Sequence, residues 1–581
     1  KSFVSEYFLG GRGVGLWAFA LTFAATNSSG GTFMGFPALI YSHGWVLALW
    51  IAGFMLVPLV AMGLLGKRLN LIARQTGAVT LPEVLGRRFA SPGVALTATV
   101  IIVFFVFFYL IAQFKAGGKI LSTLLADEPL FQRGIALVAE FTPAGLDPEY
   151  LLTLVLFSTG VIAYVVYGGF RAVVWTDVMQ GVIMFAGVVI MLVFALVQVG
   201  GLTRATRELH EMLPPEPCTV VMERAGGDAS AELVVNKGRW VKTGDSAYVV
   251  PSQAVVIPAG ERSSGQIDAY RYRDSAGREP VVGVVARVAA VEAYAYGGGQ
   301  RGAYTSAPGP SRTSPIGFLG VMAALGFFIY WPFGAASQPA NMVRLMAFRD
   351  TPTLRRSIVT VAIYYSIIYF ALVVIFCAGK VLMPGMDGDP DRVMPELAAL
   401  LTENAGVPWL AGLLVAAPFA AVMSSVDSFI LLVSSSLVRD VYQRYRPDAS
   451  ERRIRNLSYL VTFGVGVAAV LAVMNPPRYL QDLIVFAGTG LAGSFLMPVV
   501  LSLYWPRMTA RGAVAGLTGG LLVHLALTLA GRMTTGEFKA YEPFGLNAFV
   551  WDMLGSGLLV VTLSLLDKAP DDSHTARFFN H

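Results

Sequence analysis

About twelve apolar runs, each roughly as long as a membrane-spanning helix, follow one another along this chain of 581 residues. A helix needs roughly 20 apolar residues to cross about 30 Å of hydrocarbon, so such a chain can fold only as a multi-span helical membrane protein. The charged fraction of 14% is far below the roughly 25% of soluble domains and agrees with this interpretation. The expected spans are 12–41, 45–65, 92–125, 148–168, 172–200, 316–345, 357–383, 407–439, 452–474, 480–505, 511–531 and 546–567.

The loops between these runs alternate in charge. By the positive-inside rule, the Lys/Arg-rich loops are expected in the cytoplasm and the acidic loops on the outer side. The second acidic loop is also expected to hold a short surface helix from about Arg392 to Leu401. The basic loops are 66–89, 343–356 and 438–456, and the acidic loops are 126–150 and 383–404.

The distribution of charged and reactive residues argues against two classes of protein. The net charge of +6 comes from separate short loops rather than from one patch, so no nucleic-acid partner is expected. The five histidines are scattered without metal-ligand spacing, and no nucleophile–base pair stands out. The chain is therefore not expected to be an enzyme.

Residues 203–315 interrupt the series of apolar runs. This segment is polar, and alternating stretches such as ELVVNKGRWVKT and AYVVPSQAVVIP predict a small β-rich domain. By the parity of the spans it lies on the outer side, and YGGGQRGAYTSAPGPSRTSPIG is expected to be a loose linker back to the bundle. A structural lid, a partner-binding module and lineage-specific decoration all remain open, with decoration favoured.

Two apolar runs carry residues that should break a helix near its middle. The first run contains ATNSSGGTFMGFP (25–37), and the sixth contains YWPFGAASQP (330–339). A broken helix at membrane depth is tolerated only where it lines a cavity or binds an ion. Paired breaks in the first and sixth runs indicate a transporter in which helices one to five repeat, inverted, as helices six to ten. Two unrelated kinks in a packed bundle are the alternative.

The eighth apolar run carries an unusually polar stretch. At 100° per residue Ala421, Ser424, Ser425 and Ser428 share one helix face, and Asp427 lies on its flank. Hydroxyl and carbonyl oxygens are hard ligands that suit Na⁺. The serines could instead bond to carbonyls of their own helix or join neighbouring helices. Asp427 favours a cation site, because a carboxylate at membrane depth costs several kcal/mol unless it is paired, solvated or cation-bound.

Two further charges fall inside apolar runs. Asp177, near the start of the fifth run, either belongs to a functional site, complements the N-terminal dipole of its helix, or pairs with Arg171. Lys115 in the third run is a candidate buried charge, and its default explanation is that the ammonium group reaches toward the outer surface.

Several of these stretches resemble signatures of the sodium:solute symporter family. The resemblance covers nearly the whole chain except 203–315 and is greatest to the sodium/pantothenate permease group. It implies the LeuT-type fold of ten core helices in two inverted five-helix repeats, with one preceding helix that we expect upstream of Lys1. The stretches are EYFLGGRG (6–13), AVTLPEVL (78–85), YGGFRAVVWTDVMQG (167–181), AAPFAAVMSSVDS (416–428) and MNPPRYLQDLIVFAG (474–488).

The resemblance also implies cation ligands. The principal sodium site would use oxygen atoms of Ala25, Ser28, Ala421, Ser424 and Ser425. A second site, which would take Na⁺ or a proton, would involve Asp177, Ser424, Asp427 and Ser428. Cofactor use is therefore one sodium ion, or two.

The solute is expected midway through the membrane. Asn27 stands where proline carriers have an acidic residue, which argues against a proline-like zwitterion. Tyr330, Trp331 and Phe333 could equally be ordinary packing at a gate. The positions that the resemblance assigns to solute binding are Asn27, Ser29, Thr32, Gln113, Tyr330, Trp331, Phe333, Gln338 and Thr489.

The sequence thus predicts an all-α polytopic membrane protein of LeuT type with a small β-rich insert, working as a monomeric sodium-coupled symporter for a pantothenate-like or other organic carboxylate. A membrane sensor that reuses the carrier fold, with the insert as its ligand or partner domain, is the alternative. We expect it in the plasma or inner membrane with a cytoplasmic C-terminus. The expected parts are 1–202 (first repeat), 203–315 (insert), 316–506 (second repeat), 507–567 (two further helices) and 568–581 (cytoplasmic tail).

Overall fold

The computed structural model of the chain describes residues 13–579 apart from short gaps. The helix expected upstream of Lys1, most of the EYFLGGRG motif and parts of the expected linker at 296–317 lie outside the described residues. The gaps are 126–127, 144–145, 227–231, 237, 245–246, 274–278, 293–299, 311–318, 475–479 and 537.

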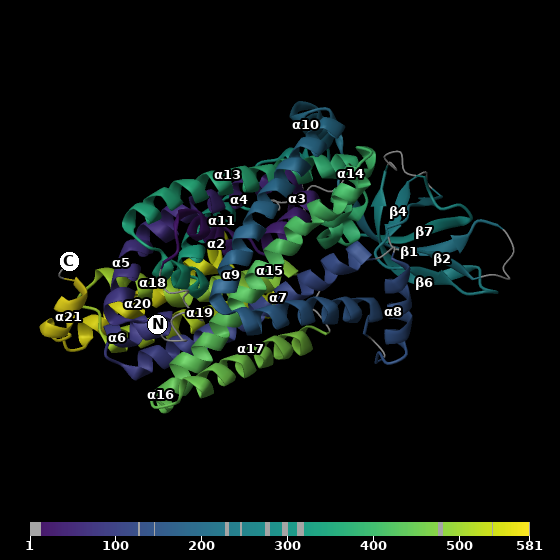
Figure 1. Cartoon of the computed structure of the whole chain (residues 1–581). Coiled ribbons are helices and arrows are strands. Elements are labelled where there is room, and N and C mark those ends of the chain that lie inside the picture. The colour runs from purple at the N-terminus through teal and green to yellow at the C-terminus, as the bar shows by residue number, and fades with distance from the viewer. Residues whose placement is uncertain are drawn as a thin grey trace.

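A long bundle of helices makes up most of the molecule, and the insert projects from one end of it (Figure 1). Its first half contains α2 (Leu16–Asn27), η2 (Gly31–Gly35), α3 (Phe36–His43), η3 (Gly44–Leu47), α4 (Ala48–Ala52), η4 (Gly53–Leu56), η5 (Pro58–Gly66), α5 (Lys67–Thr76), α6 (Leu81–Arg88), α7 (Pro92–Leu125), α8 (Pro129–Ala139), α9 (Pro148–Val199) and α10 (Leu202–Glu211). Its second half contains α11 (Val321–Ser337), α12 (Pro339–Ala347), α13 (Thr351–Leu382), α14 (Val393–Asn404), α15 (Ala411–Ser435), η10 (Ser436–Tyr442), α16 (Gln443–Tyr445), α17 (Glu451–Val473), α18 (Leu480–Tyr504), α19 (Ala510–Thr535), α20 (Ala548–Leu566) and α21 (Asp572–Phe579).

All twelve expected spans correspond to helical segments of this bundle. Nine helical stretches in the described part of the chain are long and apolar enough to cross a membrane. That count is lower than twelve because α9 contains two expected spans, and because the broken first and sixth spans leave only the shorter apolar helices α2 and α11 as separate pieces.

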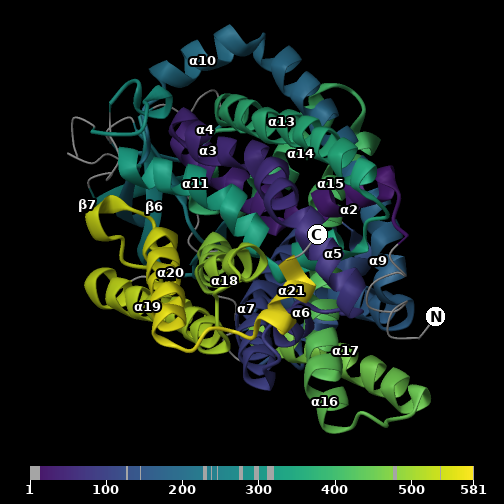
Figure 2. The same cartoon turned by 90° about the vertical axis from the view of Figure 1, so that its left-hand side faces the viewer.

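The loops sort by charge to opposite ends of the bundle. The acidic loops, with α8 and α14, lie beside the insert, and we call this the insert end (Figure 1). The basic segments α5, α6 and α16 lie together with α21 at the other end, which faces the viewer in Figure 2. Contacts join the basic segments there, since Arg439 pairs with Glu83 at 3.2 Å and Arg74 donates to the Phe348 carbonyl at 2.7 Å.

The first and sixth spans are both broken, as expected. Helix α2 ends at Asn27, and Ser28 has extended backbone angles before the chain resumes as η2. Helix α11 ends at Ser337, and Gln338 is extended with φ −69° and ψ 122° before α12 begins at Pro339. The backbone thus leaves regular helical geometry at two places inside the bundle.

Helix α9 folds back on itself at Gly169. Its 52 residues would extend about 78 Å if straight, more than twice the thickness of the hydrocarbon layer. Gly169 has φ 57° and ψ −164°, and both ends of α9 lie at the insert end. There Ser122 donates to Glu149, and Gln198 donates to the Leu401 carbonyl at 2.6 Å. Gly169 therefore separates two antiparallel spans.

Substituting Gly169 with alanine is expected to lower the free energy of unfolding by about 1–3 kcal/mol, because this backbone conformation is almost exclusive to glycine. Gly160→Ala is the matched control, since Gly160 is helical in α9 and a Cβ there meets nothing within 4 Å. Thermal unfolding in detergent should show the loss in Gly169→Ala only. Equal stability of the two variants would contradict the role given to Gly169.

The insert is a small β-barrel, as its alternating pattern predicted. Five strands close in the order β1-β6-β4-β3-β7, and β2 pairs with β5 beside them. Apolar side chains such as Val220, Met222 and Val249 fill the interior. The strands are β1 (Glu216–Arg224), β2 (Leu233–Val235), β3 (Val241–Thr243), β4 (Tyr248–Pro251), β5 (Val255–Ile257), β6 (Ser263–Tyr272) and β7 (Val284–Val291).

One expectation about the insert is wrong. Part of the segment expected to be a loose linker is docked on the bundle through the short helix η6 (Ala303–Thr305), and the Tyr304 side chain is 1% exposed. Its Gly, Ser and Pro content predicted flexibility, but one buried aromatic residue is enough to anchor such a short segment.

Candidate functional site

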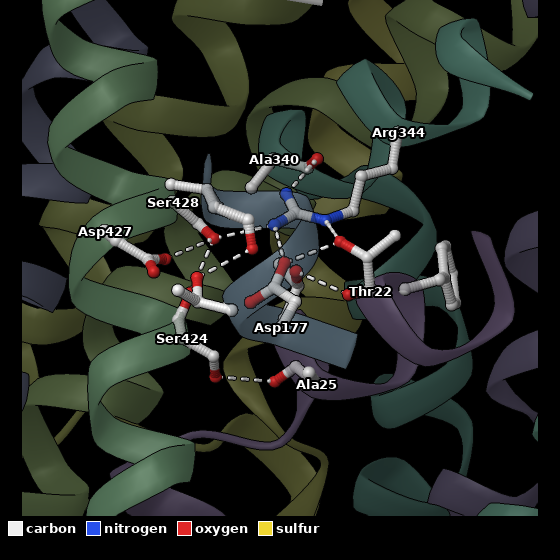
Figure 3. Close-up of polar contacts among 12 residues, drawn as sticks. Thr22, Ala25, Asp177, Ala340, Arg344, Ser424, Asp427 and Ser428 are labelled. Carbon is white, nitrogen blue, oxygen red and sulfur yellow. Dashed lines mark hydrogen bonds and ion pairs between the residues drawn. The ribbon is translucent and has the colours of Figure 1, made fainter. Parts of the chain in front are cut away.

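The polar stretch of α15 lies directly against the end of α2. The Ser424 hydroxyl is 3.0 Å from the Ala25 carbonyl and 2.9 Å from the Ala421 carbonyl. The Ser425 hydroxyl is 3.2 Å from the same Ala421 oxygen. Hydrogen bonds therefore connect oxygen atoms of four of the five residues expected at the principal sodium site. The contact between Ser424 and Ala25 joins residues 399 positions apart (Figure 3).

The fifth expected ligand, Ser28, begins the break of the first span. Its extended backbone, with φ −89° and ψ 97°, takes it out of the helix immediately after α2. Both Ser28 and Ser424 are fully buried. The donors available here are carbonyl and hydroxyl oxygens, which suit an alkali cation, and no group of three or more His, Cys, Asp or Glu that could hold a metal occurs among the described residues.

The two broken spans are joined by an amide pair. The Asn27 amide donates to Asn341 Oδ1 at 3.0 Å, and Asn341 donates back to Asn27 Oδ1 at 2.7 Å. Asn341 also donates to the Ala335 carbonyl near the end of α11 at 2.7 Å. Asn341 was not identified from the sequence as the partner of Asn27, because it belongs to no recognisable motif or spacing pattern.

A buried arginine occupies the region expected for the second cation. The Arg344 guanidinium donates through Nη2 to Asp177 Oδ2 at 2.7 Å and to the Ser428 hydroxyl at 2.8 Å (Figure 3). Its Nε donates to the Thr22 hydroxyl at 3.0 Å, and Thr22 in turn donates to Asp177 at 2.5 Å. The guanidinium therefore bridges two of the four residues expected at that site.

This pair corrects two expectations. Asp177 does not pair with Arg171, which is exposed, but with Arg344 of α12. Arg344 itself was expected in a basic loop, whereas its side chain is 3% exposed inside the bundle. Arg344 is buried by tertiary packing, and nothing in the sequence distinguishes it from the arginines of the adjoining loop.

Asp427 has two hydroxyl partners. Tyr164 of α9 donates to Asp427 Oδ2 at 2.8 Å, and the Ser428 hydroxyl is 3.1 Å from Oδ1. The Asp427 side chain is fully buried. Two carboxylates and one guanidinium thus share this buried region, in which each charge depends on the others for compensation.

A cavity lies beside the two breaks. It is partly open to solvent, and its wall has aromatic and neutral polar side chains. No Asp, Glu, Lys or Arg is among its lining residues. They are Thr26, Asn27, Ser29, Gly31, Thr32, Phe36, Phe54, Tyr109, Tyr330, Trp331, Gly334, Ala335, Gln338 and Ile484.

Six of the nine positions expected to bind solute line this cavity, and Gln113, Phe333 and Thr489 do not. The Gln113 side chain is buried and accepts the Gly30 N–H at 2.8 Å, so it supports the break of the first span. The Thr489 hydroxyl donates to the Val485 carbonyl of its own helix at 2.6 Å. Phe333 is half-buried and packs on the apolar core.

Sequence reasoning missed other lining residues, chiefly Tyr109 of α7 and the aromatic pair Phe36 and Phe54. Tyr109 is a polar aromatic residue within an otherwise apolar run, which was an available signal. The rings of Phe36 and Phe54 are 5.5 Å apart and each lies near Trp331, at 5.3 and 4.5 Å. Nothing in their sequence surroundings separates them from ordinary core packing.

Paired broken helices that meet at a buried oxygen cluster, next to a cavity, are the architecture of a secondary transporter. The sequence model of the Sodium:solute symporter family matches residues 7–236 and 310–520, so the chain belongs to this family. Most of the barrel, within 237–309, lies outside the matched residues. Membership makes the chain a transporter rather than an enzyme.

Curated relatives span nearly the whole chain. A sodium/pantothenate symporter of Haemophilus influenzae is 26% identical over 94% of this chain and 90% of its own length. One from Escherichia coli is 26% identical over 91% and 85%. A sodium/proline symporter of Haemophilus influenzae is also 26% identical, over 98% and 90%.

A solved structure supports the fold. A Na⁺-coupled sialic acid symporter in a substrate-bound outward-open state superposes with a TM-score of 0.61, at 19% identity, over 98% of this chain and 93% of that one. The expected LeuT-type fold is thereby confirmed. The two pantothenate symporters and the Haemophilus influenzae proline symporter are each 26% identical to this chain, so sequence identity alone does not identify the solute.

Proposed function

We propose that this chain imports a small organic carboxylate by alternating access, driven by Na⁺ bound between α2 and α15. The observation that carries the proposal is the contact of the Ser424 hydroxyl with the Ala25 carbonyl, next in the chain to Thr26 and Asn27, which line the cavity. A cation bound to both segments would tie α2 to α15, and its departure would free them to separate. Ion binding and cavity shape are then linked through one pair of helices.

The principal sodium site in this proposal consists of Ala25, Ser28, Ala421, Ser424 and Ser425. A carboxylate carried with one Na⁺ moves no net charge, so the membrane potential does not add to the driving force. A tenfold sodium gradient supplies about 1.4 kcal/mol, which would sustain a solute gradient of about tenfold. A single ion is therefore enough for concentrative uptake.

A second cation, Na⁺ or a proton, remains part of the proposal at Asp177, Ser424, Asp427 and Ser428. In this conformation the Arg344 guanidinium lies between Asp177 and Ser428, so a second sodium ion there requires Arg344 to withdraw. Transport with one sodium ion per solute is the stoichiometry that this geometry favours.

The cavity supports a solute with one anionic end and a polar, partly apolar body. Gln338 lines the cavity at the N-terminus of α12, where the helix dipole favours negative charge. The Trp331 indole N–H is buried without a hydrogen-bond partner among the described residues and is free to donate to a solute. A pantothenate-like carboxylate is the class we propose, in line with two of the relatives.

The positive-inside rule orients the molecule. The end with α5, α6 and α16 faces the cytoplasm in this proposal, together with the C-terminus, and the insert end faces outward. The protein then resides in the plasma or inner membrane and works as a monomer.

Uptake into proteoliposomes tests the proposed function. With an inward Na⁺ gradient, labelled pantothenate should accumulate well above its equilibrium level, and a K⁺ gradient of the same size should not support accumulation. Proline and other short carboxylates serve as comparison solutes. Uptake that is indifferent to Na⁺ would overturn the coupling, whereas Na⁺-dependent uptake of proline alone would overturn only the solute.

A further inference from the structure

A short loop covers the broken first span at the insert end. Residues 383–392, between α13 and α14, contain the turns η7 (Met386–Gly388) and η8 (Pro390–Arg392), and η8 contacts both η2 and α3. The Tyr41 hydroxyl of α3 donates to the Met383 carbonyl at 2.7 Å and accepts the Met386 N–H at 3.1 Å. Since η2 and α3 supply cavity residues, this covering loop packs on two segments that line the cavity.

Three acidic residues of the covering loop face lysines of the bundle. Asp387 pairs with Lys380 of α13 at 2.7 Å. Asp389 lies 3.1 Å from Lys119 of α7, and Asp391 lies 3.9 Å from both Lys119 and Lys115. The buried Lys115 ammonium thus lies beside the acidic covering loop at the insert end. The loop is held on two different helices of the bundle.

The insert also contacts the covering loop 383–392. Tyr272 of β6 donates its hydroxyl to Asp387 Oδ2 at 2.5 Å. Burial, and then the neighbouring Asp387 carboxylate, raises the pKa of Tyr272 well above its ordinary value, so its proton stays in place. The Trp240 ring lies against Gly385, where an added Cβ would come within 2.9 Å of it. Gly385 has φ +103°, a backbone conformation that favours glycine, so any other residue at this position would be strained.

A second connection ties the insert to the bundle. We call the segment 302–306 the strap. The Tyr304 carbonyl of the strap packs so closely on Gly44 that a Cβ added to Gly44 would clash with it. The Tyr304 ring lies 5.2 Å from the Lys380 ammonium, which also lies 4.2 Å from the Tyr41 ring. At its start the strap is fixed to α10, because Gly302 donates to the His210 carbonyl at 2.8 Å.

Lys380 is thus the point at which the bundle, covering loop and strap meet. Its side chain is 2% exposed, and Asp387 joins it in turn to Tyr272 of the barrel. Apolar side chains of the barrel itself fill its interior in the described residues. The contacts described above join the insert to the covering loop, to Lys380 of α13, to α10 and to Gly44 after α3, which is not what decoration would require.

We propose that the insert is a clamp that holds loop 383–392 closed over the cavity, and that solute enters from the insert end only when the barrel releases this loop. The inference rests on the proposed function in one respect, that solute passes through the cavity to that end. It assigns a role to residues that lie outside the family match.

A disulfide across the contact tests the clamp. A Cβ built on Gly388 would lie 3.8 Å from Ser252 Cβ, the mean separation in disulfides, so Ser252→Cys with Gly388→Cys should cross-link under mild oxidation. Solute uptake should then fall about tenfold or more and return after reduction, since a locked lid stops turnover. The two single variants are the controls, and native Cys218 and Cys377 are buried. A complete cross-link with unchanged uptake, or failure to cross-link, would overturn the clamp.

Accessibility of the cavity provides a readout that needs neither Na⁺ coupling nor a known solute. Ala335→Cys places a thiol in the cavity wall, and a membrane-impermeant maleimide added on the insert side should label it. Labelling should quicken several-fold with Trp240→Ala or the milder Tyr272→Phe, and slow several-fold in the cross-linked protein. If the labelling rate is the same in Trp240→Ala, in Tyr272→Phe and in the cross-linked protein, the clamp is wrong even if uptake depends on Na⁺. If labelling changes as expected but uptake does not depend on Na⁺, only the proposed sodium coupling is wrong.

Discussion

Ser424→Ala is expected to lower Na⁺-dependent uptake about tenfold or more and to raise the Na⁺ concentration that gives half-maximal uptake. The substitution removes a hydroxyl that touches carbonyls of both α2 and α15, at 3.0 and 2.9 Å, so it deletes an ion ligand and the link between the helices at once. Ser425→Ala should act in the same direction but more weakly, because the Ser425 hydroxyl donates to the Ala421 carbonyl of its own helix and not to α2 in the described residues.

Ser435→Ala is the matched control for these variants. Ser435 is buried on the same helix, and its hydroxyl bonds to the Leu432 carbonyl of that helix at 2.9 Å. A loss caused merely by removing a buried serine would appear in all three variants. If Ser424→Ala keeps the sodium dependence of Ser435→Ala, the principal sodium site is wrong.

Removing the charge of Arg344 is expected to destabilise the protein by about 3–5 kcal/mol, because it leaves the Asp177 carboxylate buried without its cation. Arg344→Gln and Asp177→Asn should each lower the midpoint of thermal unfolding in detergent. The double variant should recover most of the loss, since neither charge then remains uncompensated. Adding Na⁺ should stabilise Arg344→Gln more than the unmodified protein, because the position beside Asp177 becomes open to a cation.

An exposed ion pair supplies the control for the Arg344 measurements. Arg349 and Asp350 lie 2.9 Å apart with side chains 67% and 41% exposed, so Arg349→Gln should change stability by no more than about 0.5 kcal/mol. Losses in Arg344→Gln and Asp177→Asn that simply add in the double variant would show that the two side chains do not stabilise each other.

The spans and their breaks could be predicted because their causes are local. A run of apolar residues is stable as a helix in lipid whatever its neighbours are, and the breaks at Ser28 and Gln338 follow from nearby Gly, Ser and Pro residues. The common face of Ser424 and Ser425 likewise needs only the helical period. The turn at Gly169 also fell between two expected runs, in the stretch YGGF.

The side-chain partners across the bundle could not be predicted in the same way. Arg344 reads as one more basic residue of a cytoplasmic loop, and the docked strap around Tyr304 reads as a flexible linker. Of the cavity wall, Asn27 and Gln338 were expected from the family resemblance, whereas Phe54 was not expected. Each missed residue acquires its role from a helix or loop that is remote in the chain.

The sequence by itself therefore determined the membrane-spanning architecture, the two broken helices and the serine face of α15, since composition and helical period act over a few turns. Only the tertiary structure decided that Arg344 meets Asp177, 167 residues away, and that Tyr272 of the insert meets Asp387, 115 residues away. Those pairings depend on how helices pack and where loops return. In a low-dielectric interior, such packing also decides whether a charge is free to bind an ion or is already compensated.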